Sequence, residues 1–231
     1  MASAAEEADP ATPVSTCPGW TLAKLVKHTG IVHRWATQIV ATRSSEWIAQ
    51  RDLDVGLPDQ EAAYPGWLAA GAAPLCSVLR EAGPDTAVWA WGAEQNSGWW
   101  ARRMLHETTV HRVDAELAIG AKPQLAPEAA ADGIDELLSI LAIRNAAGLS
   151  ELPAGESVHL HATDSDGEWL ITFGPGGYAW QRGHAKATAA VRAPVALLLL
   201  LGYGRIRPGD ERLTLFGDAS LLSAWQEKMA F

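Results

Sequence analysis

The sequence predicts an α+β fold in which an N-terminal helical bundle is followed by a smaller domain that mixes strands and helices. In the first half of the chain, apolar residues recur every three or four positions, which is typical of amphipathic helices. Beyond Pro153 the period changes to the alternation that is typical of strands. The composition changes after Pro127, between these two patterns. We therefore expect two domains, at residues 1–125 and 126–231.

Composition excludes several classes of protein. The chain has 231 residues, of which 48% are hydrophobic and 19% charged, so a packed core is expected. Its net charge of −9 argues against nucleic acid and anionic membranes as partners. Without a secretion signal, Cys17 and Cys76 indicate a reducing compartment, so we expect a cytoplasmic protein. We interpret Cys17, which precedes a proline, as a small packed side chain.

Three segments of the first domain have the length and spacing of bundle helices: Leu22–Ala41, Gly66–Glu81 and Trp99–Ala118. Thr21 is the expected N-cap of the first segment. Gly120 and Pro123 end the third. Residues 1–16 are a lead-in that is at most partly helical, because Pro10 and Pro13 interrupt it.

The second domain is expected to contain both helices and strands. In order, these are a helix at 128–147, strands at 157–163, 169–173, 178–182 and 187–192, a helix at 195–201, a strand at 213–216 and a helix at 218–229. Asp164–Gly167 is the turn of a hairpin between the first two strands. The apolar run Val195–Leu201 is far shorter than the roughly 20 residues that cross a bilayer, so we expect a core helix.

The third helical segment carries polar residues on its apolar face. These are Arg103, Glu107, His111 and Asp114. Because burying an unpaired charge is unfavourable, they must be paired with one another or with a ligand. Glu107 and His111 lie four residues apart and so point to one place, as ligands of a divalent cation do. A structural ion-pair network between helices is the alternative that the pattern leaves open.

Four other histidines are candidates for metal ligands. His28 and His33 lie about 140° apart around the first helix, so only one of them can face a given site. His159 and His161 alternate on one face of a strand, as two metal ligands can. No carboxylate or thiolate lies at a supporting spacing in the sequence, so we interpret this second pair as exposed strand histidines.

Two motifs in the first domain resemble the mycothiol-dependent maleylpyruvate isomerase family. They are Pro18-Gly19-Trp20-Thr21 with the following Leu25–His28, and the stretch Trp100–Asp114. The region His159–Trp225 is similar to the C-terminal domain of that family. The resemblance implies a DinB-like four-helix bundle that carries a divalent metal, usually zinc. It also implies a C-terminal domain with a sterol-carrier-protein-like α/β fold.

The resemblance also implies which residues form the site. Its first metal histidine matches His28 rather than His33, and its Glu-x-x-x-His pair matches Glu107 and His111. Three protein ligands leave a coordination position open, as in a catalytic site. By its spacing, Asp114 lies one turn beyond His111, where it can hold the imidazole. Arg103 would orient Glu107 or bind an anionic substrate, with plain ion pairing as the alternative for both residues.

The resemblance implies an enzyme that uses mycothiol and a small electrophilic substrate. The metal would lower the pKa of the thiol, and the thiolate would add to the substrate. Release of the thiol after rotation about the double bond gives cis–trans isomerisation, and retention of the adduct gives S-transfer. A non-catalytic binding or stress-associated module that keeps the fold is the competing interpretation. Hydrolysis by metal-bound water would need a general base that the sequence does not identify.

The N-terminus departs from the family pattern. The family's bundle begins with a long helix ahead of the Gly-Trp-Thr turn, whereas 16 residues precede Cys17 here. Either the first helix is shortened, or the assigned start codon lies downstream of the true one. A missing helix would expose apolar surface, which a second subunit of a homodimer could cover.

Overall fold

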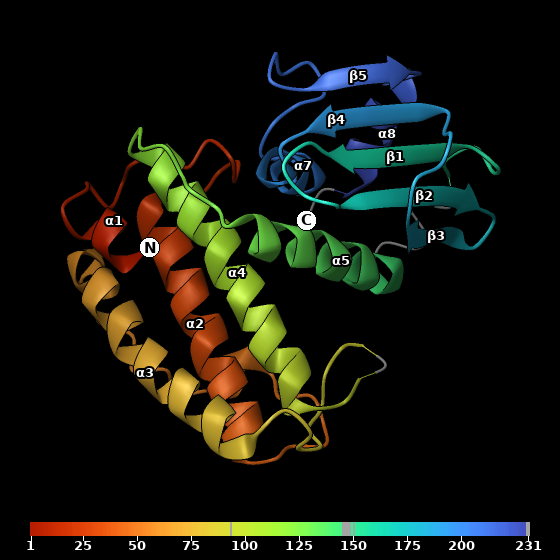
Figure 1. The fold of residues 1–231 in the computed structure, drawn as a ribbon. Helices are drawn as coiled ribbons and strands as arrows, with labels where there is room; N and C mark the ends of the chain where they lie inside the picture. The colour runs from red at the N-terminus through yellow and green to blue at the C-terminus, as the bar shows by residue number, and fades with distance from the viewer. Residues whose placement is uncertain (93, 145–148, 150, 230–231) are drawn as a thin grey trace. The chain divides into compact units, whose positions relative to one another are not determined.

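The computed structural model describes residues 1–92, 94–144, 149 and 151–229 (Figure 1). Contacts within the chain form two compact units, Met1–Pro123 and Gln124–Phe231. The first is helical and the second contains a five-stranded mixed sheet, which confirms the α+β class. The domain boundary that we expect after residue 125 stays a prediction.

The first unit consists of helices joined by loops. Its elements are α1 (Ala2–Glu6), α2 (Leu22–Ala41), the 3₁₀ turns η1 (Gln50–Asp52) and η2 (Glu61–Ala63), α3 (Tyr64–Ala82) and α4 (Ser97–Ala118). Thr21 caps α2 as predicted, because its side chain accepts a hydrogen bond from the backbone N–H of Lys24. Helix α4 begins two residues earlier than predicted because Asn96 caps it, accepting from the N–H of Trp99.

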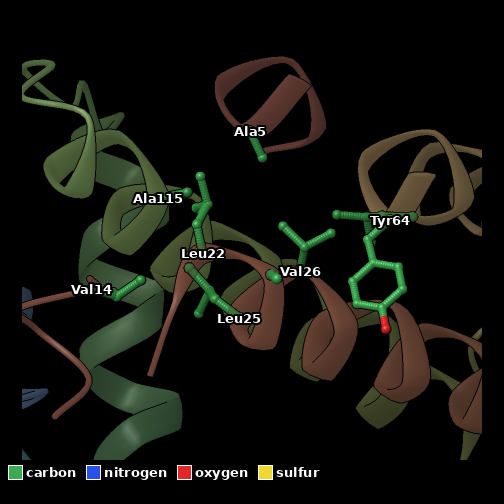
Figure 2. Close-up of a cluster of buried hydrophobic side chains, with 9 residues drawn as sticks. Ala5, Val14, Leu22, Leu25, Val26, Tyr64 and Ala115 are labelled. Carbon is green, nitrogen blue, oxygen red and sulfur yellow. The ribbon is translucent and has the colours of Figure 1, made fainter. Parts of the chain in front are cut away.

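The first helix is short. Three long helices and the five-residue α1 stand where the resemblance implies a four-helix bundle. After α1 the chain turns back on itself, and the backbone N–H of Val14 donates to the carbonyl of Trp20. Side chains from α1, from this loop and from α2, α3 and α4 meet in one buried apolar cluster (Figure 2), which includes Ala5, Val14, Leu22, Leu25, Val26, Tyr64 and Ala115. Helix α1 therefore covers apolar surface at this end of the bundle.

Helix α3 and the tryptophans complete this unit. The segment Glu61–Ala82 is apolar and long enough to cross a membrane, a property that it shares with core helices of soluble proteins. Trp67, Leu68 and Leu75 on α3 are buried. Five indole rings pack with centroid separations of 5.0 to 6.2 Å, mostly tilted or edge to face: Trp35, Trp89, Trp91, Trp99 and Trp100. These rings fill the core rather than line a site.

The second unit builds one sheet with the order β3-β2-β1-β4-β5. Its elements are α5 (Pro127–Arg144), β1 (Ser157–Ala162), β2 (Glu168–Gly174), β3 (Gly177–Arg182), β4 (Ala189–Ala193), α7 (Val195–Gly202), β5 (Thr214–Gly217) and α8 (Ala219–Met229). Strands β1 and β4 are parallel, and the other neighbours are antiparallel. The last residues predicted for the α5 helix, 145–147, and its stop at Gly148 lie outside the described residues.

The two faces of this sheet differ in character. One face is apolar and buried, with Leu160, Trp169 and Val191 among its residues. It contacts α5, because the indole N–H of Trp169 donates to Asp135 of that helix. The strand pairing places His159 and His161 on the opposite face.

Candidate metal centre

Three of the predicted site residues converge between α2 and α4. Nε2 of His28, on α2, lies 3.0 Å from Oε1 of Glu107, on α4. Nε2 of His111, one turn further along α4, lies 3.2 Å from the same oxygen. One potential ligand atom from each residue lies within 4.8 Å of the other two. The structure thus brings His28, Glu107 and His111 together, and their role as metal ligands stays a prediction.

The two supporting residues flank this cluster. The guanidinium of Arg103 donates to Oε2 of Glu107, the carboxylate oxygen that does not face the histidines. Nδ1 of His111 lies 2.9 Å from Oδ2 of Asp114, whose side chain is fully buried. Arg103 and Asp114 therefore orient the carboxylate and the imidazole, respectively. Groups behind metal ligands have this function in known metal sites.

Three residues next to the site were not predicted from the sequence to contact it. The thiol of Cys17 donates to Oδ2 of Asp114 at 3.4 Å, and the hydroxyl of Thr16 donates to Oδ1 at 2.7 Å. The ring of Trp20 lies 5.0 Å from that of His28, centroid to centroid. Cys17 is thus more than a small packed residue, because its thiol contacts the carboxylate behind His111. The turn that holds all three leads directly into the helix of His28. Their position just before that helix was the feature of the sequence that could have placed them near the site.

Charges in this cluster are strongly coupled. Burial raises the pKa of Glu107, but hydrogen bonds with His111 and His28 and the charge of Arg103 outweigh it and hold the pKa well below its ordinary value. Burial lowers the pKa of His111, but hydrogen bonds with Asp114, Cys17 and Glu107 outweigh it and raise the pKa well above its ordinary value. Without a metal, the site therefore favours an ionised Glu107 carboxylate next to a protonated His111 imidazole.

The donor set fits a divalent metal ion. Two imidazole nitrogens and a carboxylate oxygen are the ligands that zinc prefers in catalytic sites. When both imidazoles are neutral, Glu107 and Asp114 contribute two negative charges and Arg103 contributes one positive charge. The group then carries one excess negative charge. A bound cation would balance this excess in a place where side chains are mostly buried, with 12% of His111 and 14% of Glu107 exposed.

Two further histidines of this unit are buried outside the cluster. Nε2 of His33 lies 2.8 Å from the hydroxyl of Thr108, and His33 is not among the residues whose ligand atoms converge. Burial lowers the pKa of His33 to about 4. His106 is buried on α4 and was not identified from the helical spacing. The structure brings His28 rather than His33 next to Glu107 and His111, and the choice of His28 as a metal ligand stays a prediction.

The interpretation of His159 and His161 as exposed strand histidines is wrong. Only 4% of His159 is exposed, and a carboxylate is close to both histidines. That carboxylate is Glu168, which pairs with His161 across the hairpin of β1 and β2. Spacing along one strand does not reveal this neighbour, because Glu168 comes from the next strand.

Comparison with known proteins matches both parts of the chain to one family. The family model for the mycothiol maleylpyruvate isomerase N-terminal domain matches residues 1–116. The model for the C-terminal domain of the same proteins matches residues 128–224. No curated protein matches the chain significantly.

Solved structures agree with the fold. The chain is similar to the mycothiol-dependent maleylpyruvate isomerase, at 16% identity and a TM-score of 0.55, over 93% of this chain and 86% of that one. A histidine-to-alanine variant of that isomerase gives 16% identity, the same coverage and a TM-score of 0.58. A UbiJ-SCP2 ubiquinone synthesis protein matches 43% of this chain and 91% of its own, at 18% identity and a TM-score of 0.35, which is too low to carry an argument.

Proposed function

Because the chain belongs to the mycothiol maleylpyruvate isomerase family, we propose that it is a metal-dependent enzyme that uses mycothiol as its thiol cosubstrate. The observation that carries this proposal is the cluster of His28, Glu107 and His111. These residues would hold the metal, for which zinc is the best candidate. When bound, the metal would lower the pKa of a coordinated thiol and so supply a thiolate at neutral pH.

The residues around the cluster would keep the ligands in place. Asp114 holds Nδ1 of His111, which leaves Nε2 directed at the ligand group. Arg103 holds one oxygen of Glu107 and leaves the other facing both histidines. Since only 10% of the Arg103 side chain is exposed, we assign it to orienting Glu107. Binding of an anionic substrate by Arg103 would need this ion pair to open.

The reaction that follows is proposed at the level of its class. A thiolate that adds to an unsaturated, electron-poor carbon allows rotation about the former double bond. Elimination of the thiol then gives a cis–trans isomerase, as in the proteins that the family is named after. If the negatively charged adduct instead takes up a proton at the neighbouring carbon and is retained, the product is a mycothiol conjugate and the enzyme is an S-transferase. Both reactions use the same site.

One binding experiment tests the proposal. Zinc-loaded protein is titrated with mycothiol by calorimetry, and the metal content of the wild type and of His111→Ala is measured beforehand. We expect mycothiol to bind the zinc-loaded wild type, and His111→Ala to lose the metal from this site and mycothiol binding with it. Lys186→Ala, which changes an exposed residue of the other unit, serves as a control and should bind mycothiol as the wild type does.

Two results would contradict the proposal. Metal retained at this site in His111→Ala would remove His111 from the ligand set. A zinc-loaded wild type that does not bind mycothiol at millimolar concentration would instead favour a non-catalytic module. That outcome would leave the metal assignment intact and overturn the enzymatic role.

A further inference from the structure

We propose that the second unit binds a zinc ion of its own on the polar face of its sheet. The ligands are His159, Glu168 and His184, with His161 beside them as a fourth donor. None of these residues belongs to the first cluster. The site would fasten the loop between β3 and β4 to the sheet.

Strand pairing brings three of these side chains together, those of His159, His161 and Glu168. His159 and His161 lie two residues apart on β1 and so point to the same face of the sheet. Glu168 is the direct neighbour of His161 on β2, so its side chain lies on that face as well. This placement depends on two regular strands and leaves little freedom to the three side chains.

The fourth side chain is placed by a glycine. Gly183 has a φ of 138°, a conformation that favours glycine, and its backbone N–H donates to the carbonyl of Glu168 at 3.1 Å. His184 follows immediately and turns back over the sheet, where its Nδ1 lies 2.7 Å from Oε2 of Glu168. A backbone hydrogen bond therefore fixes the point from which the loop histidine reaches the carboxylate.

The distances suit a single cation. Nε2 of His159 lies 3.0 Å from Oε2 of Glu168, and Nδ1 of His161 lies 3.4 Å from Oε1. Ligand atoms of a tetrahedral zinc site with bonds of about 2.0–2.1 Å are roughly 3.3 Å apart. The potential ligand atoms of His159, Glu168 and His184 all lie within 4.8 Å of one another. Small shifts would place one ion in contact with all three.

Hydrogen bonding alone accounts poorly for this arrangement. A carboxylate only accepts, so each imidazole nitrogen that faces it must carry a proton directed at an oxygen. Nε2 of His159 is buried and 3.0 Å from such an oxygen, but the angle of this contact is poor for a hydrogen bond. A buried nitrogen whose partner is poorly directed is unfavourable. A cation between the two atoms would satisfy the lone pairs of both.

The second cluster has the same geometry as the first. In the first, rings of His28 and His111 lie 5.1 Å apart at 86°, with nitrogen–oxygen distances of 3.0 and 3.2 Å to one carboxylate. In the second, rings of His159 and His184 lie 5.4 Å apart at 88°. Among the residues that the structure describes, each unit thus holds nearly perpendicular imidazoles beside one carboxylate.

Exposure is graded across the cluster. His159 is buried, whereas 77% of the His184 side chain is exposed, so the ion would lie over the polar face of the sheet with its loop ligand outermost. Removing His184 therefore leaves the core intact. Loss of zinc binding in a variant of this residue cannot be ascribed to misfolding.

The test counts zinc ions per chain. Full-length protein is stripped with a chelator and titrated with zinc chloride by calorimetry. We expect two sites in the wild type, and one site in His28→Ala/His111→Ala with a dissociation constant of about 1 μM or lower. In that double variant, His184→Ala and Glu168→Gln should each weaken zinc binding by about 100-fold or more. Lys186→Ala, which removes an exposed residue of the same loop, should bind as before.

A second measurement reports on the loop itself. Trypsin cleaves after the exposed Lys186, and zinc should slow this cleavage in His28→Ala/His111→Ala but not when His184→Ala is added. The inference is overturned if His28→Ala/His111→Ala binds no zinc at micromolar concentration, or if His184→Ala and Glu168→Gln leave its affinity unchanged. A wild type that binds one zinc, lost in His184→Ala and kept in His28→Ala/His111→Ala, would support this site and contradict the metal centre of the first unit.

Discussion

Asp114 is a fully buried carboxylate that is bonded to three neighbouring side chains. It contacts the thiol of Cys17, the hydroxyl of Thr16 and Nδ1 of His111. An imidazolium at His111 satisfies this carboxylate when the metal is absent, and its pKa is accordingly raised well above the ordinary value. A metal ion requires the neutral imidazole, so it must displace that proton.

The first prediction concerns this proton. At pH 7, zinc binding to the first unit should release about one proton, because His111 is protonated before binding and neutral afterwards. Calorimetry of His184→Ala in buffers of different ionisation enthalpy measures the number, since that variant lacks a ligand of the second cluster. Adding Asp114→Asn to His184→Ala should lower the number of protons released, because Asp114, the first of the groups that raise the pKa of His111, loses its charge. Release of no proton in either protein would contradict the account of His111.

His33 predicts a dependence of stability on pH. Burial lowers its pKa from 6.5 to about 4 in the folded chain, so it stays neutral there while the unfolded chain takes up a proton. The unfolded state therefore binds more protons between pH 6.5 and about 4, and stability falls as the pH falls through this window. Above pH 6.5 both states are neutral and the effect vanishes.

His33→Gln removes this proton uptake and keeps a polar side chain near Thr108. Between pH 6.5 and 5, metal-free wild type should lose up to about 2 kcal/mol more unfolding free energy than this variant. Urea denaturation followed by tryptophan fluorescence measures the difference. Equal losses in both proteins would show that His33 is not a buried neutral histidine.

At the scale of elements, the close approach of α2 and α3 depends on one glycine. A Cβ atom at Gly30 would lie 2.1 Å from the ring of Trp67. That ring has little freedom to move, because its N–H donates to the carbonyl of Val55 and the guanidinium of Arg34 lies 3.9 Å from the ring centroid. The two helices therefore pack at a distance that only glycine permits at this position.

Gly30→Ala should lower the free energy of unfolding by about 1–3 kcal/mol, in spite of the higher helix propensity of alanine. Gly66→Ala is the matched control, since nothing lies within 4 Å of a Cβ atom there. It should raise stability by about 0.5–1 kcal/mol. Urea denaturation of the two variants gives both values. A Gly30→Ala protein as stable as Gly66→Ala would mean that Trp67 yields easily.

Elements were easier to predict from the sequence than the contacts between them. Thr21 marks the start of α2 because a cap acts locally, and residue spacing is enough to place Glu107 and His111 on one face of α4. Cys17 and Glu168 were missed because each reaches its partners through tertiary contacts, one through a turn and the other across a strand pair. Spacing along the chain does not report such neighbours.

At the scale of the whole molecule, each histidine cluster is built within one unit. His28, Glu107 and His111 belong to Met1–Pro123, and the second cluster belongs to Gln124–Phe231. Since no ligand is shared, substitutions in one cluster should leave zinc binding in the other unchanged. The change from helical to alternating patterns predicted the fold class, but it did not predict that strands β1 and β4 are parallel neighbours. That pairing joins segments separated by a whole hairpin.

The most direct test of the account is to locate the metal in crystals of the zinc-loaded protein. Diffraction data on both sides of the zinc absorption edge give an anomalous difference map that marks zinc alone. We expect a peak about 2.0–2.2 Å from Nε2 of His28, from Nε2 of His111 and from the Glu107 carboxylate. Zinc found elsewhere in the protein, with these three side chains bonded only to one another, would contradict the metal centre.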